Sequence, residues 1–395
     1  MSSHAVFIHN PGAADYCFGE EHPFNPIRLS ITCDLLETLG ALSPHERLLA
    51  QSPPCREELL SLVHRQDYIE AVQQLSRNQT AAAGLTDPSR YGLDTNDTPC
   101  FTGMHEAAAA IVSGSVLAAE QVMSGEALHA YHMAGGLHHA FPDRGAGFCI
   151  YNDAAVAIRH IREKYGARVL YIDTDVHHGD GVQWVFYDDP DVFTYSIHET
   201  GKYLFPGTGY VHEKGTDQGF GACINVPLEP YTEDDSWMES FQSTITRVAE
   251  AFKPDIIVSQ HGCDAHAYDP LSHIHCSMRI YQEMPALIHQ LAHQYAEGRW
   301  VALGGGGYDI WQVVPRAWSL VWLTMTEHPL LSELAAPGAE SVALPEQWRT
   351  RWAEQGQHEL PEYWLDQPDS IPPIPRREEI TGKNRETQSI ILHNL

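Results

Sequence analysis

A run of acidic and histidine side chains, YIDTDVHHGDG, follows a short apolar segment near the middle of the chain. In an extended chain, residues two apart point to the same side, so Asp175 and His177 can reach one ion. A carboxylate oxygen beside an imidazole nitrogen suits Zn²⁺ or a similar divalent cation. The run could be a solvated turn, but it begins where the apolar strand 168–172 ends, which is where α/β folds bind ligands. We therefore expect a metal site here.

Polar side chains of catalytic types also follow three other apolar segments that we interpret as strands. A His or Asp after a single strand would mean little, but four such segments in one chain form a pattern. The carboxyl ends of parallel strands meet along one edge of a sheet, so their polar residues can share one pocket. The further segments are 127–131, followed by His138 and His139, 255–260, followed by Asp264, and 300–303, followed by Tyr308.

Asp175, His177 and Asp264 together would give the ligands that a catalytic metal requires. A catalytic zinc has about three protein ligands and leaves one position open for water. Two carboxylates make this set hard and nearly neutral overall, so Fe²⁺ or Co²⁺ would also fit. The ion would make the water more acidic and polarise a carbonyl. The sequence therefore predicts a site for metal-ion catalysis.

The adjacent His138 and His139 supply imidazoles, the side chains best suited to proton transfer near neutral pH. Asp173 and Asp180 are not needed as metal ligands. They can instead hydrogen-bond the far nitrogens of the two rings and fix their tautomers. A structural loop contact is the competing interpretation of a lone His pair, and it loses weight beside the metal candidates.

Four consecutive glycines, residues 304–307, precede Tyr308. Glycine permits positive φ and lets the backbone approach a ligand closely, so this loop can bring the Tyr308 hydroxyl into a pocket. A phenol beside a metal is a suitable donor to an oxyanion. The glycines could instead bind phosphate, but the run lacks the Gly-Lys-Ser/Thr ending of a P-loop.

The segments that carry these residues alternate short apolar strands with amphipathic helices. This alternation predicts βαβ units and an α/β fold with a mostly parallel, multi-stranded sheet and helices on both faces. No Pro-, Ser- or Gly-rich linker divides the chain, so we expect a single domain over residues 1–370. Residues 371–395 are Pro-rich and then charged, and we expect a loosely attached tail that packs by a few residues or is disordered.

The chain of 395 residues carries 24 Lys and Arg against 52 Asp and Glu, a net charge of −28. Binding to nucleic acid or to an anionic membrane requires basic patches, so this charge argues against both partners. Solubility accounts for most of this charge, and an attraction for cationic substrates is the second interpretation. Eight cysteines at irregular spacings, with no CxxC pair, indicate reduced thiols. Because the N-terminal residues have no basic and apolar leader, we expect a cytoplasmic protein.

Six segments of the chain resemble the motif set of the histone deacetylase superfamily, in that family's order. The resemblance covers roughly residues 4–320 and implies an arginase/deacetylase-like fold. Finer features, such as HPFNPIR and YDPLSHIH, are most similar to the bacterial acetoin-utilisation (AcuC-type) deacetylases and less similar to acetylpolyamine amidohydrolases. The six segments are HMAGGLHHA, GFCIYNDAA, YIDTDVHHGDG, LFPGTG, HGCDAHAYDP and LGGGGYD.

The resemblance implies a role for each matching residue of the catalytic centre. His139 would be the general base and acid, while His138 would mainly stabilise charge and Tyr308 would donate to the substrate carbonyl. A structural K⁺ would bind Ser196 and the backbone oxygens of three residues of the long motif. The resemblance implies that Asp175, His177 and Asp264 bind Zn²⁺. It implies that Asp173 and Asp180 hold the two histidines. The backbone oxygens that would bind K⁺ belong to Asp173, Asp175 and His177.

The resemblance also implies a substrate channel. Phe148 and Phe205 match its two aromatic walls, whose faces can sandwich a methylene chain. Asp97 matches, more loosely, a carboxylate that grips the substrate backbone. Arg28 matches a buried arginine beneath the site, where acetate could leave. The glycines expected to line the substrate site are Gly147 and Gly306.

The sequence as a whole predicts a zinc-dependent amidohydrolase that removes acetyl groups from N-acetyl-lysine of proteins and releases acetate. Two alternatives stay open: a deacetylase of small acetylated amines such as acetylpolyamines, and a non-catalytic binder of acyl-lysine. A binuclear manganese ureohydrolase fits less well, because the extra carboxylates for a second metal are missing. Nothing in the sequence indicates an oligomeric state.

Overall fold

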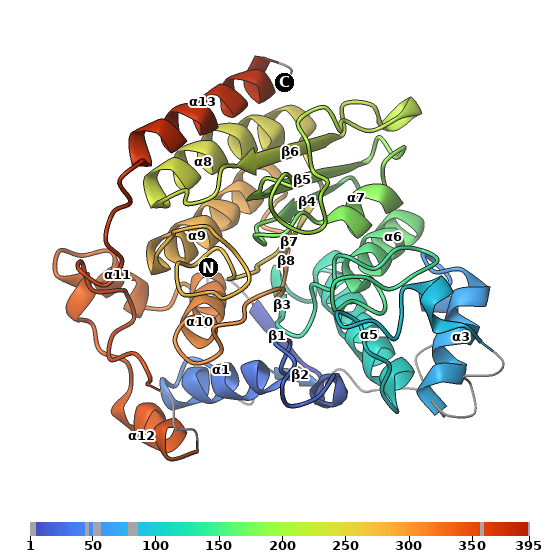
Figure 1. The fold of residues 1–395 in the computed structure, drawn as a ribbon, viewed down its shortest axis with the longest axis horizontal. Helices are drawn as coiled ribbons and strands as arrows, with labels where there is room; N and C mark the ends of the chain where they lie inside the picture. Colours follow the sequence, from blue (N-terminus) through green and yellow to red (C-terminus); the bar gives the residue numbers. More distant parts are fainter. Residues whose placement is uncertain (1–4, 44–46, 50–56, 78–85, 356–358, 394–395) are drawn as a thin grey trace.

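Eight parallel strands form one sheet at the centre of the computed structural model, which describes residues 5–43, 47–49, 57–77, 86–355 and 359–393. Their order is β2-β1-β3-β8-β7-β4-β5-β6, and every neighbouring pair runs in the same direction (Figure 1). All carboxyl ends therefore lie along one edge. The strands are β1 (Ala5–His9), β2 (Arg47–Leu49), β3 (His129–His132), β4 (Val169–Asp173), β5 (Val192–Glu199), β6 (Cys223–Leu228), β7 (Ile256–Gln260) and β8 (Trp300–Leu303).

Helices cover both faces of this sheet. Figure 1 shows α1, α10, α9 and α8 on one side and α3, α5 and α6 on the other. The first group comprises α1 (Ile27–Thr38), α8 (Asp234–Phe252), α9 (Met278–Tyr295) and α10 (Val314–Met325). The second group comprises α3 (Gln66–Arg77), α5 (Met104–Met123) and α6 (Asp153–Tyr165). The shorter helices and the last one are α2 (Glu57–Leu60), α7 (Asp180–Val185), α11 (Leu330–Leu334), α12 (Glu346–Gln355) and α13 (Arg377–His393).

Alternating side chains of each strand build two separate hydrophobic cores. In β4, Leu170 and Ile172 pack into the core beneath α8 and α9, whereas Val169 and Tyr171 pack into the core beneath α5 and α6. Successive strand residues point to opposite faces, so a strand covered on both sides is apolar throughout. The polar residues that follow such strands are consequently the first that can face solvent or a ligand.

The α/β fold predicted from the sequence is confirmed, and the sheet is entirely parallel. The strand expected at 300–303 has those bounds in the structure, and the one expected at 168–172 is β4, displaced by one residue. The sequence pattern misses β2, which has only three residues, and β6, in which Asn225 and Pro227 interrupt the apolar run. Pro227 is tolerated because β6 lies at the edge of the sheet, where one side of the strand needs no partner.

The C-terminal segment is helical and packs on the fold by a few residues, which is the first of the two states expected from the sequence. Residues 377–393 form helix α13, which packs against α8 and β6. Ile380, Asn384 and Ile391 are buried on it. The amide of Asn384 accepts a hydrogen bond from the N–H of Glu229 at 2.9 Å and donates to the hydroxyl of Thr232 at 2.8 Å. A few buried positions in an otherwise charged helix are a weak sequence signal, which explains why the composition suggested disorder.

Candidate active site

Three side chains from two strand ends converge on one point at the carboxyl edge of the sheet. Asp175 and His177 follow β4, and Asp264 follows β7. The Nδ1 atom of His177 lies 3.2 Å from Oδ1 of Asp175 and 3.0 Å from Oδ2 of Asp264. All three residues are buried, and one ligand atom from each lies within 4.8 Å of the others. The structure thus brings together the three residues that the sequence proposes as metal ligands.

The other oxygen of each carboxylate is held by donors from the protein. Asp175 Oδ2 accepts hydrogen bonds from Gln260 Nε2 at 2.8 Å and from the N–H of Gly306 at 2.7 Å. Asp264 Oδ1 accepts the N–H of Val176 at 2.9 Å. A Cβ atom at position 306 would lie 2.2 Å from Oδ2 of Asp264, so only glycine fits there. These contacts fix which carboxylate oxygens face the shared point.

The electrostatics of this set favour a cation. Burial and the charge of Asp175 raise the pKa of Asp264 to about 6. Burial disfavours a charged His177, but hydrogen bonds to the two carboxylates outweigh it and raise the pKa of His177 to about 10. Two buried carboxylates so close together demand positive charge between them. Oxygen and nitrogen donors in this number match the ligand sets of Zn²⁺ and of other divalent first-row metals, so the residues fit such an ion.

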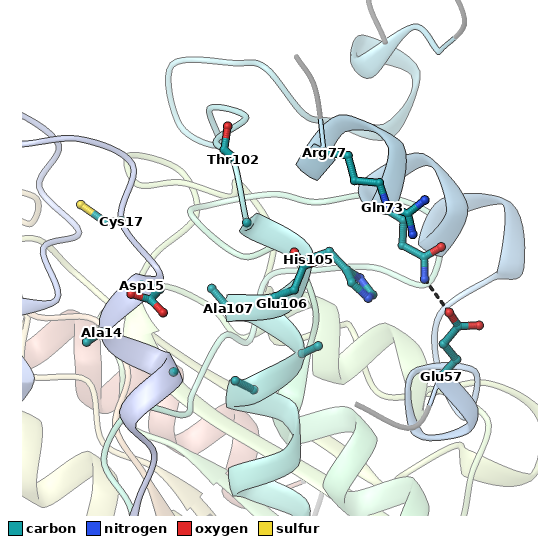
Figure 2. A pocket seen from close by; sticks show the side chains of 14 residues that line it. Ala14, Asp15, Cys17, Glu57, Gln73, Arg77, Thr102, His105, Glu106 and Ala107 are labelled. Carbon is teal, nitrogen blue, oxygen red and sulfur yellow. Dashed lines mark hydrogen bonds between the residues drawn. The ribbon is translucent and has the colours of Figure 1, made fainter. Parts of the chain in front are cut away.

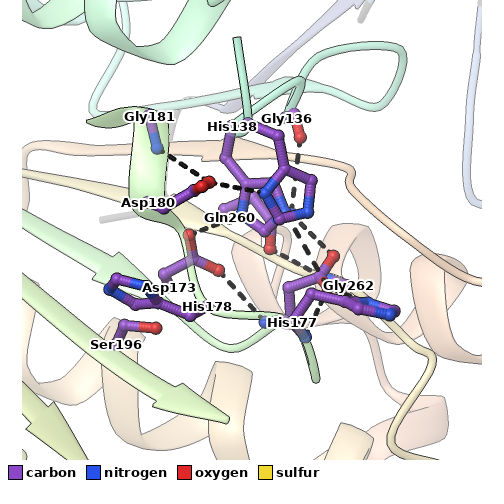
Figure 3. Close-up of polar contacts among 12 residues, drawn as sticks. Gly136, His138, Asp173, His177, His178, Asp180, Gly181, Ser196, Gln260 and Gly262 are labelled. Atoms are coloured by element: carbon purple, nitrogen blue, oxygen red, sulfur yellow. Dashed lines mark hydrogen bonds and ion pairs between the residues drawn. The ribbon is translucent and has the colours of Figure 1, made fainter. Parts of the chain in front are cut away.

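His138 and His139 lie beside this set, and each is bonded to a different aspartate. His138 Nδ1 is 2.8 Å from Oδ2 of Asp173 (Figure 3). The same oxygen accepts the hydroxyl of Tyr171 at 2.8 Å. Burial would lower the pKa of His138, but the charges of Asp173 and Asp175 outweigh it and raise this pKa to about 9. His138 therefore has a strong tendency to carry positive charge.

His139 has the opposite tendency. Its Nδ1 is 2.7 Å from Oδ1 of Asp180, which is held in turn by the N–H of Gly181 at 2.9 Å. Burial and the charge of His138 lower the pKa of His139 to about 4. The centroids of the two imidazole rings are 4.0 Å apart. A pair of rings whose pKa values are pushed apart in this way can divide the tasks of base and charge stabiliser between them.

Asn152 connects the loop that carries the His pair to the start of helix α6. Its side-chain oxygen caps helix α6 by accepting the N–H of Ala155 at 2.9 Å. Its side-chain N–H₂ group donates to the carbonyl of His138 at 3.1 Å and to that of Ala140 at 2.9 Å. Asparagine is a common N-cap, and here both ends of the amide are used. The start of α6 and the loop that carries both histidines are thus held by one side chain.

Tyr308 follows the glycine run after β8, and its ring centroid lies 6.5 Å from that of His177. The N–H of Tyr308 donates to Oδ2 of Asp269 at 2.7 Å. Gly305 and Gly307 adopt φ of +146° and +140°, which side-chain-bearing residues rarely adopt, so this turn needs glycine. Burial and the charges of nearby carboxylates raise the pKa of the Tyr308 phenol well above its ordinary value. Its hydroxyl consequently keeps its proton at neutral pH and can donate it in a hydrogen bond.

The aromatic residues expected to line a channel border the His pair and Tyr308. The ring of Phe205 is 5.0 Å from that of His139 and the ring of Phe148 is 5.7 Å from that of Tyr308, between centroids. Phe205 is 44% exposed, an unusual position for a large apolar side chain. A Cβ atom on Gly147 would lie 2.5 Å from His139 and 2.9 Å from Phe205, so this glycine is what allows the two rings to approach.

Two further residues proposed from the resemblance lie around this centre. Asp97 is exposed, and its charge and backbone act on His22, whose pKa is lowered by burial. The His22 ring is in turn 4.7 Å from that of Phe148, between centroids. Buried Arg28 donates to the carbonyls of Gly305 and Gly307, at 3.1 and 3.0 Å, beneath the turn that carries Tyr308.

The residues considered for K⁺ are neighbours in the sheet. Ser196 of β5 pairs with Asp173 of β4 in the strand register. Its hydroxyl lies 2.8 Å from Nδ1 of His198. The two residues therefore come together as the sequence expectation requires, and potassium binding stays a prediction.

Several histidines at the strand ends have structural partners instead. His178 contacts the hydroxyl of Thr208 and the side-chain oxygen of Gln183, both at 2.8 Å. His261 lies 2.7 Å from the hydroxyl of Ser259, and His266 lies 2.9 Å from Asp366. Residue type and position after a strand did not distinguish these from the histidines that point to the centre. Their orientation depends on contacts that only the fold supplies.

Other residues contribute to the centre without having been singled out in the sequence. Gln260 is a buried polar residue at the end of strand β7, and a polar residue in that position is a signal that the sequence contains. Tyr171 lies inside an apolar strand and Asn152 precedes a helix, where each has an ordinary structural explanation. Asp269, one of the polar residues that the sequence places after the strand 255–260, has no role assigned to it there and anchors the backbone of Tyr308.

A further hollow lies apart from this centre. It has a volume of about 860 Å³ and lies between the 3-10 turn Pro11–Asp15 and helices α2, α3 and α5. Figure 2 shows Asp15, Glu57, Gln73, Arg77, His105 and Glu106 around it. These residues lie beside stretches of chain outside the described residues, so the hollow does not define a site.

A comparison with known protein families places the site in context. The histone deacetylase domain matches residues 22–325, which include both strand ends and the His pair. The chain belongs to the histone deacetylase family. This deacetylase is 52% identical to the acetoin utilization protein AcuC of Bacillus subtilis (strain 168), over 98% of its own length and 97% of that protein's. It is 45% identical to AcuC of Staphylococcus xylosus, over 99% and 98% of the two chains. The resemblance found in the sequence is thus confirmed.

Solved structures show the same fold. The deacetylase superposes on a crystal structure of an HDAC homolog from Aquifex aeolicus with a TM-score of 0.81 and 26% identity, covering 96% of this chain and 99% of that one. A crystal structure of an HDAC homolog complexed with SAHA matches equally well. Among the residues that the structure describes, no helix has the length and apolar character needed to cross a membrane.

Proposed function

We propose that this deacetylase hydrolyses N-acetyl-lysine side chains of proteins in the cytoplasm, with one Zn²⁺ as its catalytic metal, and releases acetate. The observation that carries the proposal is that three candidate metal ligands, a pair of aspartate-bonded histidines and a phenol lie together beside exposed Phe205. This combination supplies every group that hydrolysis of an amide requires.

The metal would be held by Asp175, His177 and Asp264. When bound, it supplies Lewis-acid polarisation of the substrate carbonyl and makes a water more acidic. Fe²⁺ or Co²⁺ would satisfy the same donors. Residues beyond the ligands keep the carboxylates in place, since Gln260 and the N–H of Gly306 hold the outer oxygen of Asp175.

His139 is the residue we assign to proton transfer. Its Nδ1 is occupied by Asp180, so Nε2 is the atom free to accept a proton from the attacking water. The water oxygen bonds to the carbonyl carbon, the C–N bond then breaks, and His139 returns the proton to the leaving amine. His138, paired with Asp173, stays next to the developing negative charge and stabilises it.

Tyr308 would donate its hydroxyl proton in a hydrogen bond to the carbonyl oxygen as negative charge develops there. Its raised pKa keeps the proton on the phenol throughout. The anchored N–H of Tyr308 and the glycine turn fix the position of the ring before substrate arrives. A hydrogen-bond donor that is already in position stabilises developing negative charge more strongly in a site that excludes water than in water itself.

The substrate side of the proposal rests on Phe148, Phe205 and Gly147. Acetylated lysine has a neutral amide at the end of an apolar methylene chain, and aromatic faces suit such a chain. Gly306 would lie beside the acetyl group, next to the carboxylates. Exposed Asp97 could accept N–H groups of the peptide that carries the lysine, with Arg28 beneath the site where acetate leaves.

The experiment compares substrates with one purified protein preparation. The chain is freed of metal, reloaded with Zn²⁺, and offered acetyl-lysine peptides and acetylated polyamines. We expect kcat/KM to be higher for peptides, and we expect a His139→Gln variant to turn over neither class. Turnover of the polyamines alone would replace the proposed substrate. Peptide binding without turnover under any metal would show a binder in place of an enzyme.

A further inference from the structure

Three histidines cluster at the amino edge of the sheet, on the opposite side from the candidate active site. His129 is the first residue of β3. His289 and His293 are four residues apart on α9, so they lie on the same face of that helix. The cluster joins the last turns of α9 to the sheet, in a region that no step of the proposed hydrolysis uses.

The three imidazoles turn the same nitrogen toward one point. His289 Nε2 is 3.1 Å from Nε2 of His129 and 3.0 Å from Nε2 of His293. The three ring centroids are 4.8, 5.2 and 4.6 Å apart, and the ring planes cross at 73°, 83° and 89°. One nitrogen from each ring lies within 4.8 Å of the others. The rings thus surround a common centre from three directions.

Hydrogen bonding alone does not account for this arrangement. A neutral imidazole nitrogen carries either one proton or one lone pair, in the plane of its ring. Nε2 of His289 has two nitrogen neighbours at bonding distance and can serve only one of them well. Protonating all three rings would place like charges within a few ångströms of each other in a partly buried place. A cation that accepts three lone pairs removes both difficulties.

We propose that His129, His289 and His293 form a second metal site, for Zn²⁺ or another divalent cation that prefers imidazole. Nitrogens that are each 2.0–2.1 Å from one ion lie roughly 2.9–3.4 Å apart, depending on the coordination angle. The two Nε2 separations of 3.0 and 3.1 Å fall in that range. Imidazole nitrogens suit Zn²⁺, Cu²⁺, Ni²⁺ and Co²⁺ and exclude the hard cations Mg²⁺ and Ca²⁺.

The surroundings hold the rings in place before metal arrives. Gly298 has φ of +82°, and a Cβ atom on it would lie 3.1 Å from Cε1 of His293. The indole of Trp300 packs 5.8 Å from the rings of both His129 and His289, between centroids. Preorganised ligands lose less conformational entropy when they bind an ion. The site is therefore built by the packing of the amino edge.

The site is open on one side. His129 is fully buried, His289 is half-buried and His293 is exposed, so an ion can enter from the His293 side and keep a position for water. The carboxylate of exposed Glu327 acts electrostatically on His289 and adds attraction for a cation. An ion bound here would link α9 to β3 and stabilise the folded chain in proportion to its concentration.

The test removes the active-site ligands first. In an Asp175→Ala/Asp264→Ala chain, Co²⁺ and Zn²⁺ are titrated and bound metal is measured after desalting. We expect about one equivalent per chain to remain, with the visible spectrum of imidazole-bound Co²⁺, and a thermal midpoint that rises with metal concentration. Adding His289→Ala should weaken binding by at least tenfold, because losing even a residue behind a ligand costs about 10–100-fold.

A matched control is His212→Ala, which removes an exposed histidine that stacks on Tyr210 and lies in another part of the fold. Equal loss of metal in the His212 and His289 variants would mean adventitious surface binding and would overturn the proposal. If the double aspartate variant does not fold, the intact chain replaces it. Zinc content should then fall from two equivalents to one on His289→Ala, and an unchanged content would also overturn the second site.

Discussion

The Nδ1 atom of His139 lies 2.7 Å from Oδ1 of Asp180, which is the first residue of helix α7. The same oxygen accepts the N–H of Gly181 at 2.9 Å. A negative charge at the first turn of a helix is favourable, and here it also orients a ring. The position of the imidazole is therefore set by the start of a helix and by one carboxylate.

Replacing Asp180 with Asn should lower kcat while leaving the metal site intact. The amide keeps the shape but presents a weaker acceptor, or a donor, to Nδ1 of His139, so the wrong tautomer becomes accessible. We expect a loss of about 10–100-fold, by analogy with other residues that orient a functional imidazole. Steady-state kinetics and zinc content on one preparation measure both effects. Asp188→Asn, a carboxylate outside the site, is the matched control and should change neither.

Asp264→Ala should abolish activity and remove the active-site metal. The change deletes one of three candidate ligands and leaves the N–H of Val176 without its acceptor at 2.9 Å. Metal content after dialysis, compared with wild type, is the primary measurement. Full zinc retention at the active site, or activity without metal, would contradict the ligand assignment. Asp264→Asn separates the role of metal ligand from the role of hydrogen-bond acceptor, because its amide oxygen can still accept the N–H of Val176.

Tyr308→Phe should reduce kcat far more than it changes KM. The variant removes one hydroxyl and keeps the ring, the glycine turn and the N–H bond to Asp269. Loss of one oxyanion donor typically costs on the order of 10²–10³ in kcat. Substrate still binds through the metal and the aromatic residues, so KM should move little. If kcat stays within about threefold of wild type while the melting temperature falls, Tyr308 is a structural residue.

Asp97→Asn should raise KM for acetylated peptides and leave a minimal acetyl-lysine substrate nearly unaffected. Asp97 is exposed, and the proposed contact with the substrate backbone needs the peptide N–H groups that a minimal substrate lacks. The loss of one hydrogen bond to a charged group is worth about 1.5–3 kcal/mol, or roughly 10–100-fold in kcat/KM. Equal losses on the two substrates would argue against a backbone contact. Zinc content should match that of wild type.

The buried His64 predicts a loss of stability in mild acid. Its Nδ1 lies 3.1 Å from the carbonyl of Phe141, which can only accept, and its Nε2 accepts the N–H of Asn152 at 3.0 Å. The folded state therefore needs the neutral ring, and burial lowers the pKa of His64 to about 4. The unfolded chain takes up a proton below its ordinary pKa of about 6.5.

The pKa difference of His64 between the folded and unfolded states sets the direction in which stability changes with pH. Between pH 6.5 and about 4 the unfolded state binds a proton at this position that the folded state does not, so the free energy of unfolding falls as pH falls. Denaturant melts at pH 7.5, 6 and 5 should show a shallower pH dependence for His64→Gln than for wild type, from a lower starting stability. The exposed His212→Gln should keep the wild-type slope.

The sequence was sufficient to predict those parts of the site that lie immediately after apolar strands. Asp175, His177 and Asp264 were found because a sharp change from apolar to polar residues marks the end of a buried parallel strand. Gly147 and Phe205 came from the family resemblance, since their closeness to His139 depends on two loops that periodicity does not describe. The same limit explains why His178 and His261 could not be separated from the His pair before their partners were known.

Residues that act through a tertiary contact were beyond the reach of local pattern. Gln260 holds a carboxylate from a neighbouring strand, and Asn152 holds a loop from the start of a helix. The His129 cluster is a clearer case, because 160 residues separate His129 from His289 in the chain. Only the strand order, which places β3 next to β8, brings the two segments together.

Helix α13 also shields the outermost strand of the sheet. Asn384 closes over the end of β6 by accepting the N–H of Glu229, and buried Ile380 and Ile391 lie on the same helix. An uncovered outer strand offers unpaired backbone groups to any other chain and invites aggregation. The charged C-terminal segment therefore bears on how this protein behaves at high concentration. A chain cut before residue 377 would retain its chemistry and become prone to self-association.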